Sequence, residues 1–243
     1  NNLARNVQTR LFPGAAELPG SARFAAWCQP FKEIGGDMFD LVRLDDDRFA
    51  IMIGDVSGKG MPASLIMSAT MMLFRTEVRH GGGAAEILGR LNGVLTDILQ
   101  GDMFVTMGLG IYDGGHRRLQ YASAGHMAPY LVRDGSAAQL DCASLPLGID
   151  KEERYTETDI RVTDGDLLVL YTDGVVESIA PDGTNMLGFD MLEKQLAELD
   201  LREPATSLLD RLVNGLFSAP SGKHEDDRTI AVVKWMNRQL ENR

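Results

Sequence analysis

The stretch Gly54-Asp55-Val56-Ser57-Gly58-Lys59-Gly60 directly follows the apolar run Phe49-Ala50-Ile51-Met52-Ile53. Five consecutive apolar residues predict a buried strand, and the apolar pattern over residues 61–78 predicts a long helix behind the turn. A carboxylate at the exit of a buried strand is costly unless a cation neutralises it. A strand, an acidic glycine-rich turn and a helix therefore predict a site for phosphate, for metal, or for both.

The composition is that of an ordinary globular chain with an acidic balance. Of the 243 residues, 44% are hydrophobic and 24% are charged, and the formal net charge is −11. This charge argues against nucleic acid as a partner, because that affinity comes from Lys and Arg neutralising phosphates. No stretch approaches the roughly 18 apolar residues of a membrane helix. We expect a cytoplasmic domain, in a full-length protein that could be membrane-tethered.

The order of the predicted elements indicates the fold class. Strands are expected at 22–29, 38–44, 49–53, 104–112, 119–123, 130–133, 156–162, 167–171 and 229–236, and helices at 1–12, 61–78, 84–100, 190–198 and 204–217. Many strands, paired helices and no regular βαβ alternation predict an α+β fold of antiparallel sheets covered by helices. The expected divisions are a linker or signalling helix (1–18), one domain (19–238) and a tail (239–243).

Four places share one pattern, an aspartate beside a glycine or a second acid at the end of an apolar run. They are Gly36-Asp37, Gly54-Asp55, Asp173-Gly174 and Asp226-Asp227. One such pair more often only makes a turn. Four together favour a hard divalent cation, because Mg²⁺ and Mn²⁺ prefer carboxylate and carbonyl oxygens and need no His or Cys. Two metals about 3.5–4 Å apart would make a site that activates water for hydrolysis.

Three other interpretations fail in detail. The segment 54–59 is similar to a P-loop, but its spacing is one residue short and Gly60 stands where Ser or Thr should bind magnesium. The segment 35–39 is similar to the diguanylate cyclase signature, but it lacks the glutamate. The segment 164–166 precedes its apolar strand, whereas an aspartyl-phosphate motif would follow one.

The histidines offer one candidate for the site. No Ser-His-Asp or Cys-His signature stands out, and His80, His116 and His224 fall at predicted helix ends or turns. His126, in Ala124-Gly125-His126, is the remaining candidate, although a lone histidine beside a glycine is more often a structural hydrogen-bonding group.

Seven segments follow one another in a specific order. They are Pro30–Asp40, Gly54–Gly60 with Ala63, Phe104–Thr106, Ala124–His126 with Pro129, Pro146–Gly148, Tyr171–Glu177 and Asp226–Thr229. In this order they resemble the metal-dependent protein phosphatases, the PPM family, and specifically its bacterial SpoIIE-like (RsbU-like) branch. The resemblance implies a four-layer αββα sandwich, with two antiparallel sheets face to face, a helix pair outside each, and metals at one end.

The resemblance also implies a metal shell of two divalent cations, Mn²⁺ or Mg²⁺. Asp37 and Asp55 would lie between the two metals, with the carbonyl of Val56 as a main-chain ligand. Asp173 and Asp226 would complete the shell of the second metal. Asp227 is counted with the metal residues, in a role that supports this shell more than it binds directly.

Other residues take less direct roles in the same resemblance. Lys32 would contact the substrate phosphate as a point charge where type-2C relatives carry an arginine, and Gly174 is a second substrate-binding candidate. Supporting roles are expected for Asp40, Ser57, Lys59 and His126. Those relatives carry a histidine just after the Asp55-like ligand, proposed as general acid, whereas Val56-Ser57 stands here. The resemblance therefore assigns no general acid.

The implied reaction is hydrolysis of phosphoserine or phosphothreonine on a protein. In this branch the substrate is typically an anti-sigma-factor antagonist of the STAS fold. Further implied partners are an upstream sensor or receiver domain in the same full-length chain and a second copy in a homodimer. The alternative is a catalytically silent or upstream-gated phosphatase-like binding module, and the complete acidic set favours the enzyme.

Overall fold

The computed structural model describes residues 2–99, 103–140, 143–180, 185–217 and 226–236. Within them, strands form a six-stranded and a five-stranded sheet, and every pairing is antiparallel. The six-stranded sheet has the order β1-β2-β11-β10-β7-β8, from β1 (Ala16–Leu18), β2 (Ala22–Gln29), β7 (Tyr130–Arg133), β8 (Ser136–Gln139), β10 (Leu167–Tyr171) and β11 (Arg228–Trp235). The five-stranded sheet has the order β3-β4-β5-β6-β9, from β3 (Met38–Arg43), β4 (Arg48–Val56), β5 (Val105–Asp113), β6 (Arg118–Ala124) and β9 (Glu157–Arg161).

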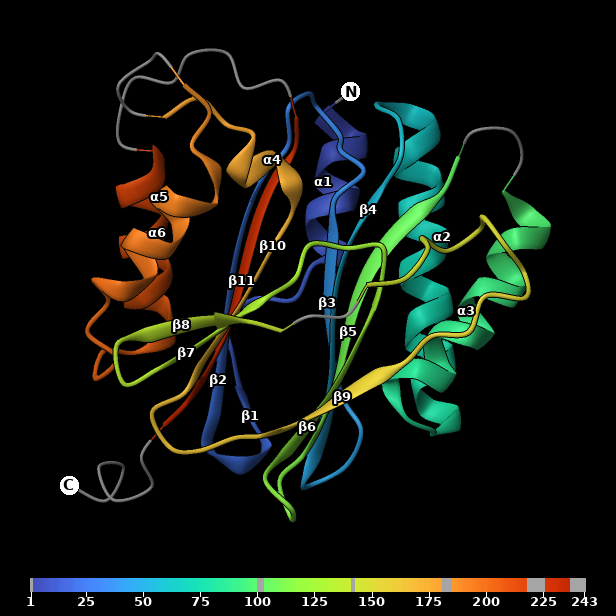
Figure 1. Ribbon diagram of the computed structural model, residues 1–243. Coiled ribbons are helices and arrows are strands. Elements are labelled where there is room, and N and C mark those ends of the chain that lie inside the picture. Colours follow the sequence, from blue (N-terminus) through green and yellow to red (C-terminus); the bar gives the residue numbers. More distant parts are fainter. Residues whose placement is uncertain (1, 100–102, 141–142, 181–184, 218–225, 237–243) are drawn as a thin grey trace.

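Helices cover the outer face of each sheet, as Figure 1 shows. The helices are α1 (Asn2–Leu11), α2 (Met61–Glu77), α3 (Ala84–Ile98), α4 (Asp173–Val176), α5 (Gly188–Ala197) and α6 (Ala205–Phe217), with short 3-10 turns at Pro19–Ser21 and Val78–His80. The pair α2 and α3 lies on the five-stranded sheet, and the pair α5 and α6 lies on the six-stranded sheet. The predicted αββα sandwich is confirmed. No helix among the described residues is long and apolar enough to span a membrane.

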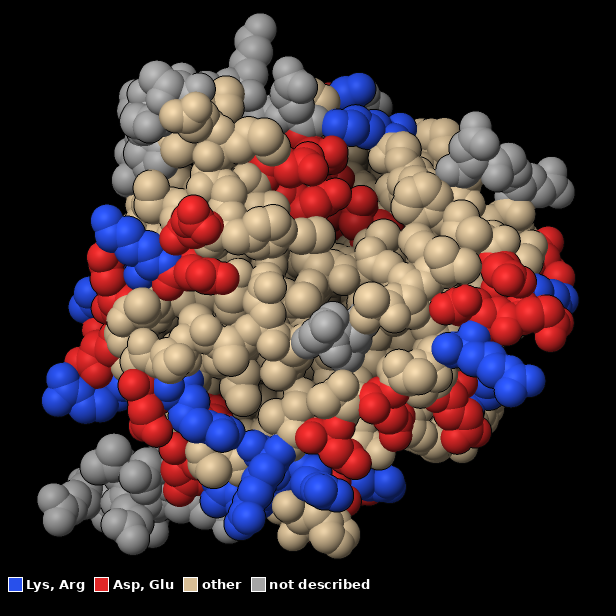
Figure 2. Space-filling model, in the orientation of Figure 1, with Lys and Arg blue, Asp and Glu red and all other residues tan. Residues whose placement is uncertain are grey.

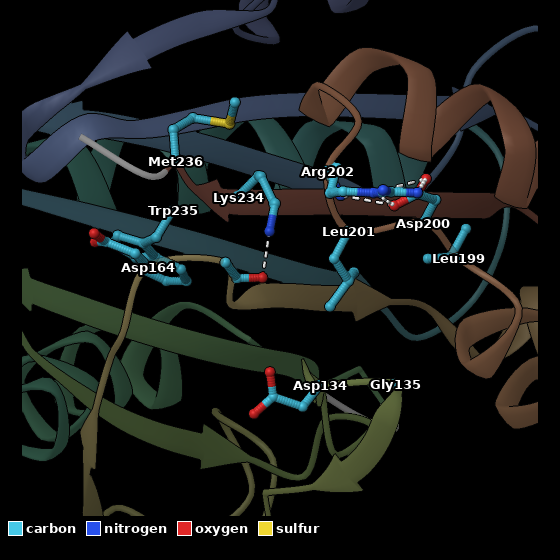
Figure 3. Close-up of a pocket in the computed structure, with 11 residues that line it drawn as sticks. Asp134, Gly135, Asp164, Leu199, Asp200, Leu201, Arg202, Lys234, Trp235 and Met236 are labelled. Carbon is cyan, nitrogen blue, oxygen red and sulfur yellow. Dashed lines mark hydrogen bonds and ion pairs between the residues drawn. The ribbon is translucent and has the colours of Figure 1, made fainter. Parts of the chain in front are cut away.

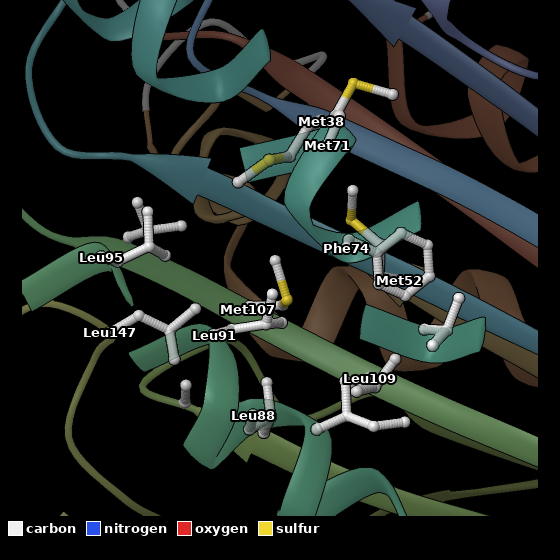
Figure 4. Packing of buried hydrophobic residues seen from close by; sticks show 14 of the residues in the cluster. Met38, Met52, Met71, Phe74, Leu88, Leu91, Leu95, Met107, Leu109 and Leu147 are labelled. Carbon is white, nitrogen blue, oxygen red and sulfur yellow. The ribbon is translucent and has the colours of Figure 1, made fainter. Parts of the chain in front are cut away.

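The apolar run in β4 reflects burial on both faces of its sheet. Ile51 and Ile53 belong to the core between the two sheets, whereas Ala50 and Met52 belong to the core under α2 and α3. Figure 4 shows the second of these cores, in which methionines from strands and helix fill the space beside leucines of α3. A strand with two buried faces has no polar positions, which is why the sequence gives a continuous apolar run.

Most predicted elements are present, and three short ones were missed. The predicted bounds of β2, β7 and β10 agree with the structure to the residue. The missed elements are β1, β8 and α4, of three to four residues each. Both missed strands lie at the edges of their sheet and lack an apolar run. The predicted tail at 239–243 lies outside the described residues.

A buried ion pair fastens α2 to the five-stranded sheet. Asp40 of β3 is 1% exposed, and both its oxygens accept hydrogen bonds from Arg75 of α2, at 2.5 and 3.1 Å. Arg75 also donates to the carbonyl of Leu11 at the end of α1, at 2.7 Å. One guanidinium thus holds two helices against β3, while the expected supporting role of Asp40 at the site stays a prediction.

Arg75→Met should destabilise the fold by about 3 kcal/mol, because it leaves the Asp40 carboxylate buried without a counter-ion. Arg43→Met is the matched control, because it removes an arginine from the exposed pair with Asp46 and should cost less than about 1 kcal/mol. Urea unfolding of both variants measures the difference. Equal losses of the free energy of unfolding in the two variants would show that the buried pair stabilises the fold no more than the exposed pair does.

Candidate metal centre

The aspartates singled out in the sequence meet at one end of the sandwich. Asp55 lies near the end of β4, and Asp37 directly precedes β3, its neighbour in the five-stranded sheet. Asp173 follows β10, and the pair Asp226-Asp227 precedes β11, which is adjacent to β10 in the other sheet. Figure 2 shows acidic side chains gathered in one patch at the end of the sandwich where α4 lies. Antiparallel pairing therefore brings together residues far apart in the sequence.

Asp37 is the most deeply buried member of this group. Its side chain is 2% exposed, and its Oδ2 accepts hydrogen bonds from the hydroxyls of Thr172, at 2.8 Å, and Thr229, at 2.6 Å. Both threonines belong to the opposite sheet, after β10 and within β11. Burial, followed by the charge of Asp55, raises the pKa of Asp37 well above its usual range. Asp37 thus links the two sheets at the acidic end.

Asp227 shapes the loop that carries Asp37. Its Oδ1 accepts from the amide of Phe31, and its Oδ2 accepts from the amide of Gly36, both at 2.7 Å. A Cβ on Gly35 would lie 2.3 Å from that Oδ2, so the loop needs a glycine there. Since main-chain amides engage both oxygens, the geometry favours a supporting role for Asp227.

Gly36 lets this loop approach the end of β4. A Cβ at Gly36 would lie 2.9 Å from the carbonyl oxygen of Val56 and 3.0 Å from Oδ1 of Asp55. The carbonyl and the carboxylate, both expected metal ligands, therefore border the same small space. A larger residue at position 36 would fill it.

The carboxylates of this group raise one another's pKa. Burial, followed by the charges of Asp173, Asp226 and Asp227, raises the pKa of Asp55 to about 8. Burial and Asp226 also raise the pKa of Asp173. Carboxylates with one main-chain carbonyl are the donors that Mg²⁺ and Mn²⁺ prefer, so the residues present fit such ions.

Within the described residues, no three His, Cys, Asp or Glu side chains already stand at the spacing of a metal-binding group. Asp226 instead pairs with Lys59, whose Nζ lies 3.0 Å from its Oδ2. A cation bound by Asp226 would take the place of this ammonium. Lys59 thus contacts Asp226, and its expected supporting role stays a prediction.

Two ammonium groups flank Phe31 beside the acidic end. Nζ of Lys59 lies 5.3 Å and Nζ of Lys32 lies 5.7 Å from the centroid of this ring. Lys32 is exposed, in the loop that Asp227 holds. An anionic group approaching the acidic end can therefore meet a cation there, which supports the predicted substrate contact by Lys32.

The two other supporting candidates hold the turn and its neighbouring strand. Oγ of Ser57 accepts from the amide of Phe104 at 2.8 Å, which ties the turn after β4 to the start of β5. His126 pairs through Nδ1 with Oγ1 of Thr106 at 2.9 Å, and Thr106 lies opposite Asp55 in the sheet. Burial lowers the pKa of His126 to about 4, so its ring is neutral at physiological pH. His126 therefore supports the strand pair carrying Asp55.

Gly174 lies buried beneath the acidic end. A Cβ there would lie 1.9 Å from the carbonyl oxygen of Asp227, so packing requires a glycine at this position. Its amide donates to Oδ1 of Asp173 at 2.8 Å. These contacts explain why position 174 is a glycine, whereas a contact between Gly174 and the substrate stays a prediction.

Sequence reasoning assigned no role to Thr172, Thr229 or Gln8. The two threonines lie inside segments that carried the family resemblance, and that position was the available signal. Gln8 of α1 donates from Nε2 to the carbonyl of Gly35 at 2.9 Å and accepts from the amide of Gly35 at 3.2 Å. The first helix therefore contacts the loop that leads to Asp37.

Comparisons with known proteins agree with this fold. The family model for Stage II sporulation protein E (SpoIIE) matches residues 45–236. The chain is 30% identical over 234 residues to phosphoserine phosphatase RsbU of Bacillus subtilis (strain 168), covering 96% of this chain and 69% of the relative.

Solved structures show a similar fold over most of the chain. The SiaA-PP2C domain of Pseudomonas aeruginosa superposes with a TM-score of 0.83 at 21% identity, covering 96% of this chain and 94% of that one. RsbX in complex with magnesium superposes with a TM-score of 0.65 at 17% identity, covering 87% and 94%. The chain belongs to the SpoIIE family of PP2C-fold protein serine/threonine phosphatases.

Proposed function

We propose that this chain hydrolyses phosphoserine or phosphothreonine on a partner protein with the help of two divalent cations, Mg²⁺ or Mn²⁺. The observation that carries the proposal is the meeting of Asp37, Asp55, Asp173 and Asp226 from both sheets, with the pKa of Asp55 raised by its acidic neighbours. Two such cations, when bound, lower the pKa of water and stabilise charge on a phosphoryl group.

The chain's own residues divide the work at this site. Asp37, Asp55 and the Val56 carbonyl, together with Asp173 and Asp226 beside the opposite sheet, would hold the cations. Asp227 fixes the loop around Gly36, as its two amide contacts support. Lys32 attracts the substrate phosphate, which the chain's net charge of −11 would otherwise repel.

The phosphoprotein is proposed to be a STAS-type anti-sigma-factor antagonist. The similarity to phosphoserine phosphatase RsbU supports a phosphoserine protein as the substrate. A phosphorylated STAS protein should therefore be dephosphorylated faster than a phosphotyrosine peptide of equal charge. Phosphate release measured with both substrates tests this choice, and equal rates would contradict it.

Asp55→Asn and Asp173→Asn should each lower Mn²⁺-dependent phosphate release at least about 100-fold, since even residues that only orient metal ligands cost 10–100-fold. Asp159→Asn is the matched control, because Asp159 is an exposed acid on β9. Calorimetric Mn²⁺ titration beside circular dichroism separates lost metal binding from lost folding. Near-normal turnover in either site variant would refute the metal assignment.

The metal-free protein should lose stability as pH rises. Folding raises the pKa of Asp55 to about 8, against roughly 3.9 in an unfolded chain. The folded state then holds a proton that the unfolded chain releases, so the free energy of unfolding falls between about pH 4 and pH 8. Urea unfolding after EDTA treatment measures this trend.

Two controls accompany the pH series. Asp55→Asn should flatten the trend, whereas Asp159→Asn should leave it unchanged. Saturating Mn²⁺ should oppose the trend, because metal binding requires deprotonated ligands. A metal-free protein that gains stability between about pH 5 and pH 8 would contradict the assigned pKa of Asp55.

One observation favours gating by an upstream segment as a second candidate. Gln8 joins α1 to Gly35, two residues before Asp37, so a shift of this helix would move the loop that carries a proposed metal ligand.

Gln8→Ala should weaken Mn²⁺ binding and lower phosphate release. Thr9→Ala, which removes an exposed hydroxyl bonded within α1, should change neither. Metal binding without turnover in the unaltered chain would favour the gated module. Unchanged Mn²⁺ affinity in Gln8→Ala would argue against gating through this contact.

A further inference from the structure

A cavity of about 310 Å³ lies at the end of the sandwich opposite the acidic group. Four segments line it: the β7–β8 turn (Asp134 and Gly135), the β9–β10 turn (Asp164 and Gly165), the α5–α6 connection (Leu199 to Arg202) and the end of β11 (Lys234 to Met236). The strands β10 and β11 each run from this cavity to the acidic end. At about 3.3 Å per residue, the eight residues of β11 separate the two places by roughly 25 Å.

Lys234 brings a buried positive charge to this cavity. Its residue is 1% exposed, and Nζ donates a hydrogen bond to the carbonyl of Gly165, as Figure 3 shows. Burial lowers the pKa of Lys234 to about 8. An ammonium has three donors, and the hydrogen bond to Gly165 uses one of them.

The charge of Asp166 acts on this lysine and partly offsets the lowering of its pKa, but the oxygens of Asp166 are bonded to other groups. Asp166 accepts from Nε and Nη2 of Arg133, at 2.8 and 2.6 Å, and from the amide and hydroxyl of Thr163, at 2.7 and 3.1 Å. Within the described residues, Lys234 forms no ion pair. A buried ammonium that has no carboxylate at ion-pair distance among the described residues has donors left for an anion.

The rest of the lining limits the kind of anion. Leu199, Leu201, Trp235 and Met236 give the cavity an apolar wall. Asp200 at the rim is paired with Arg202, at 2.7 Å, and Asp164 is paired with Arg117. Asp134 is a third, exposed acid at the rim. Three rim carboxylates beside two arginines and one buried ammonium disfavour a multiply charged anion.

We propose that this cavity binds a small organic monocarboxylate with an apolar body, whose carboxylate pairs with Lys234. The body would lie against Leu199, Leu201 and Met236, which are partly exposed at the cavity. At roughly 30 Å³ per water-sized group, the volume admits about ten non-hydrogen atoms. Nothing in this proposal involves the metal residues, so it stands or falls independently of the phosphatase assignment.

Phenylacetate and phenylacetamide are matched probes, because they have the same size and differ in charge. Titration of each into the metal-free protein, followed by NMR of Lys Cε and Leu methyl groups, measures their affinities. Phenylacetate should bind with a dissociation constant on the order of 1 mM, and phenylacetamide at least about 10-fold more weakly. Inorganic phosphate should bind more weakly than phenylacetate.

Three variants test the site itself. Lys234→Met should weaken phenylacetate binding at least about 10-fold, whereas Lys194→Met, which removes an exposed lysine from α5, should not. Leu201→Trp fills the cavity while keeping Lys234, so it should abolish binding even if Lys234→Met fails to fold.

Specific results would overturn the proposal. In the unaltered protein, these are a dissociation constant for phenylacetate above about 10 mM, equal affinity for phenylacetate and phenylacetamide, or tighter binding of phosphate than of phenylacetate. Among the variants, phenylacetate affinity that is unchanged in a folded Lys234→Met or in Leu201→Trp would also overturn it.

Discussion

The hydrogen bonds of Asp37 with Thr172 and Thr229 are the contact on which the rest of the site depends. They join a carboxylate of one sheet to two hydroxyls of the other, in the interior of the sandwich. Removing a charge from water costs several kcal/mol unless its lone pairs find partners. The threonines supply two of these partners, and the burial and acidic surroundings of Asp37 leave a strong electrostatic demand for positive charge at this end.

Some residues around Asp37 present oxygen atoms that could bind a metal, and others hold those residues in place. Both carboxylate oxygens of Asp227 accept hydrogen bonds from main-chain amides. Gly35 and Gly36 allow the chain to pass close to Asp227 and Asp55. His126, through Thr106, supports the strand opposite Asp55. The positions of the oxygen atoms proposed as metal ligands therefore depend on groups that need not touch a metal or a substrate.

Buried charges elsewhere in the sandwich show a useful contrast. Asp40 is paired with Arg75, and Asp166 is paired with Arg133, so each buried carboxylate has its cation. At the acidic end the carboxylates raise one another's pKa although Asp226 pairs with Lys59, and at the opposite end Lys234 forms no ion pair within the described residues. Incompletely compensated charge thus distinguishes the two places where a ligand is proposed from the places where charge serves the fold.

The sequence by itself determined the main strands, the helix pairs and the aspartates at the strand ends. These features are local: strands with two buried faces read as apolar runs, and an Asp beside Gly or a second acid marks one end of each of four strands, the start of β3 and β11 and the exit of β4 and β10. It missed β1, β8 and α4, which are too short to show a period. Only the tertiary structure decided that Thr172 and Thr229 hold Asp37, that Gln8 meets Gly35, and that Lys234 is buried beside a cavity. Asp37 lies 135 residues from Thr172 and 192 from Thr229, and such pairings arise from how the sheets pack, which no local pattern encodes.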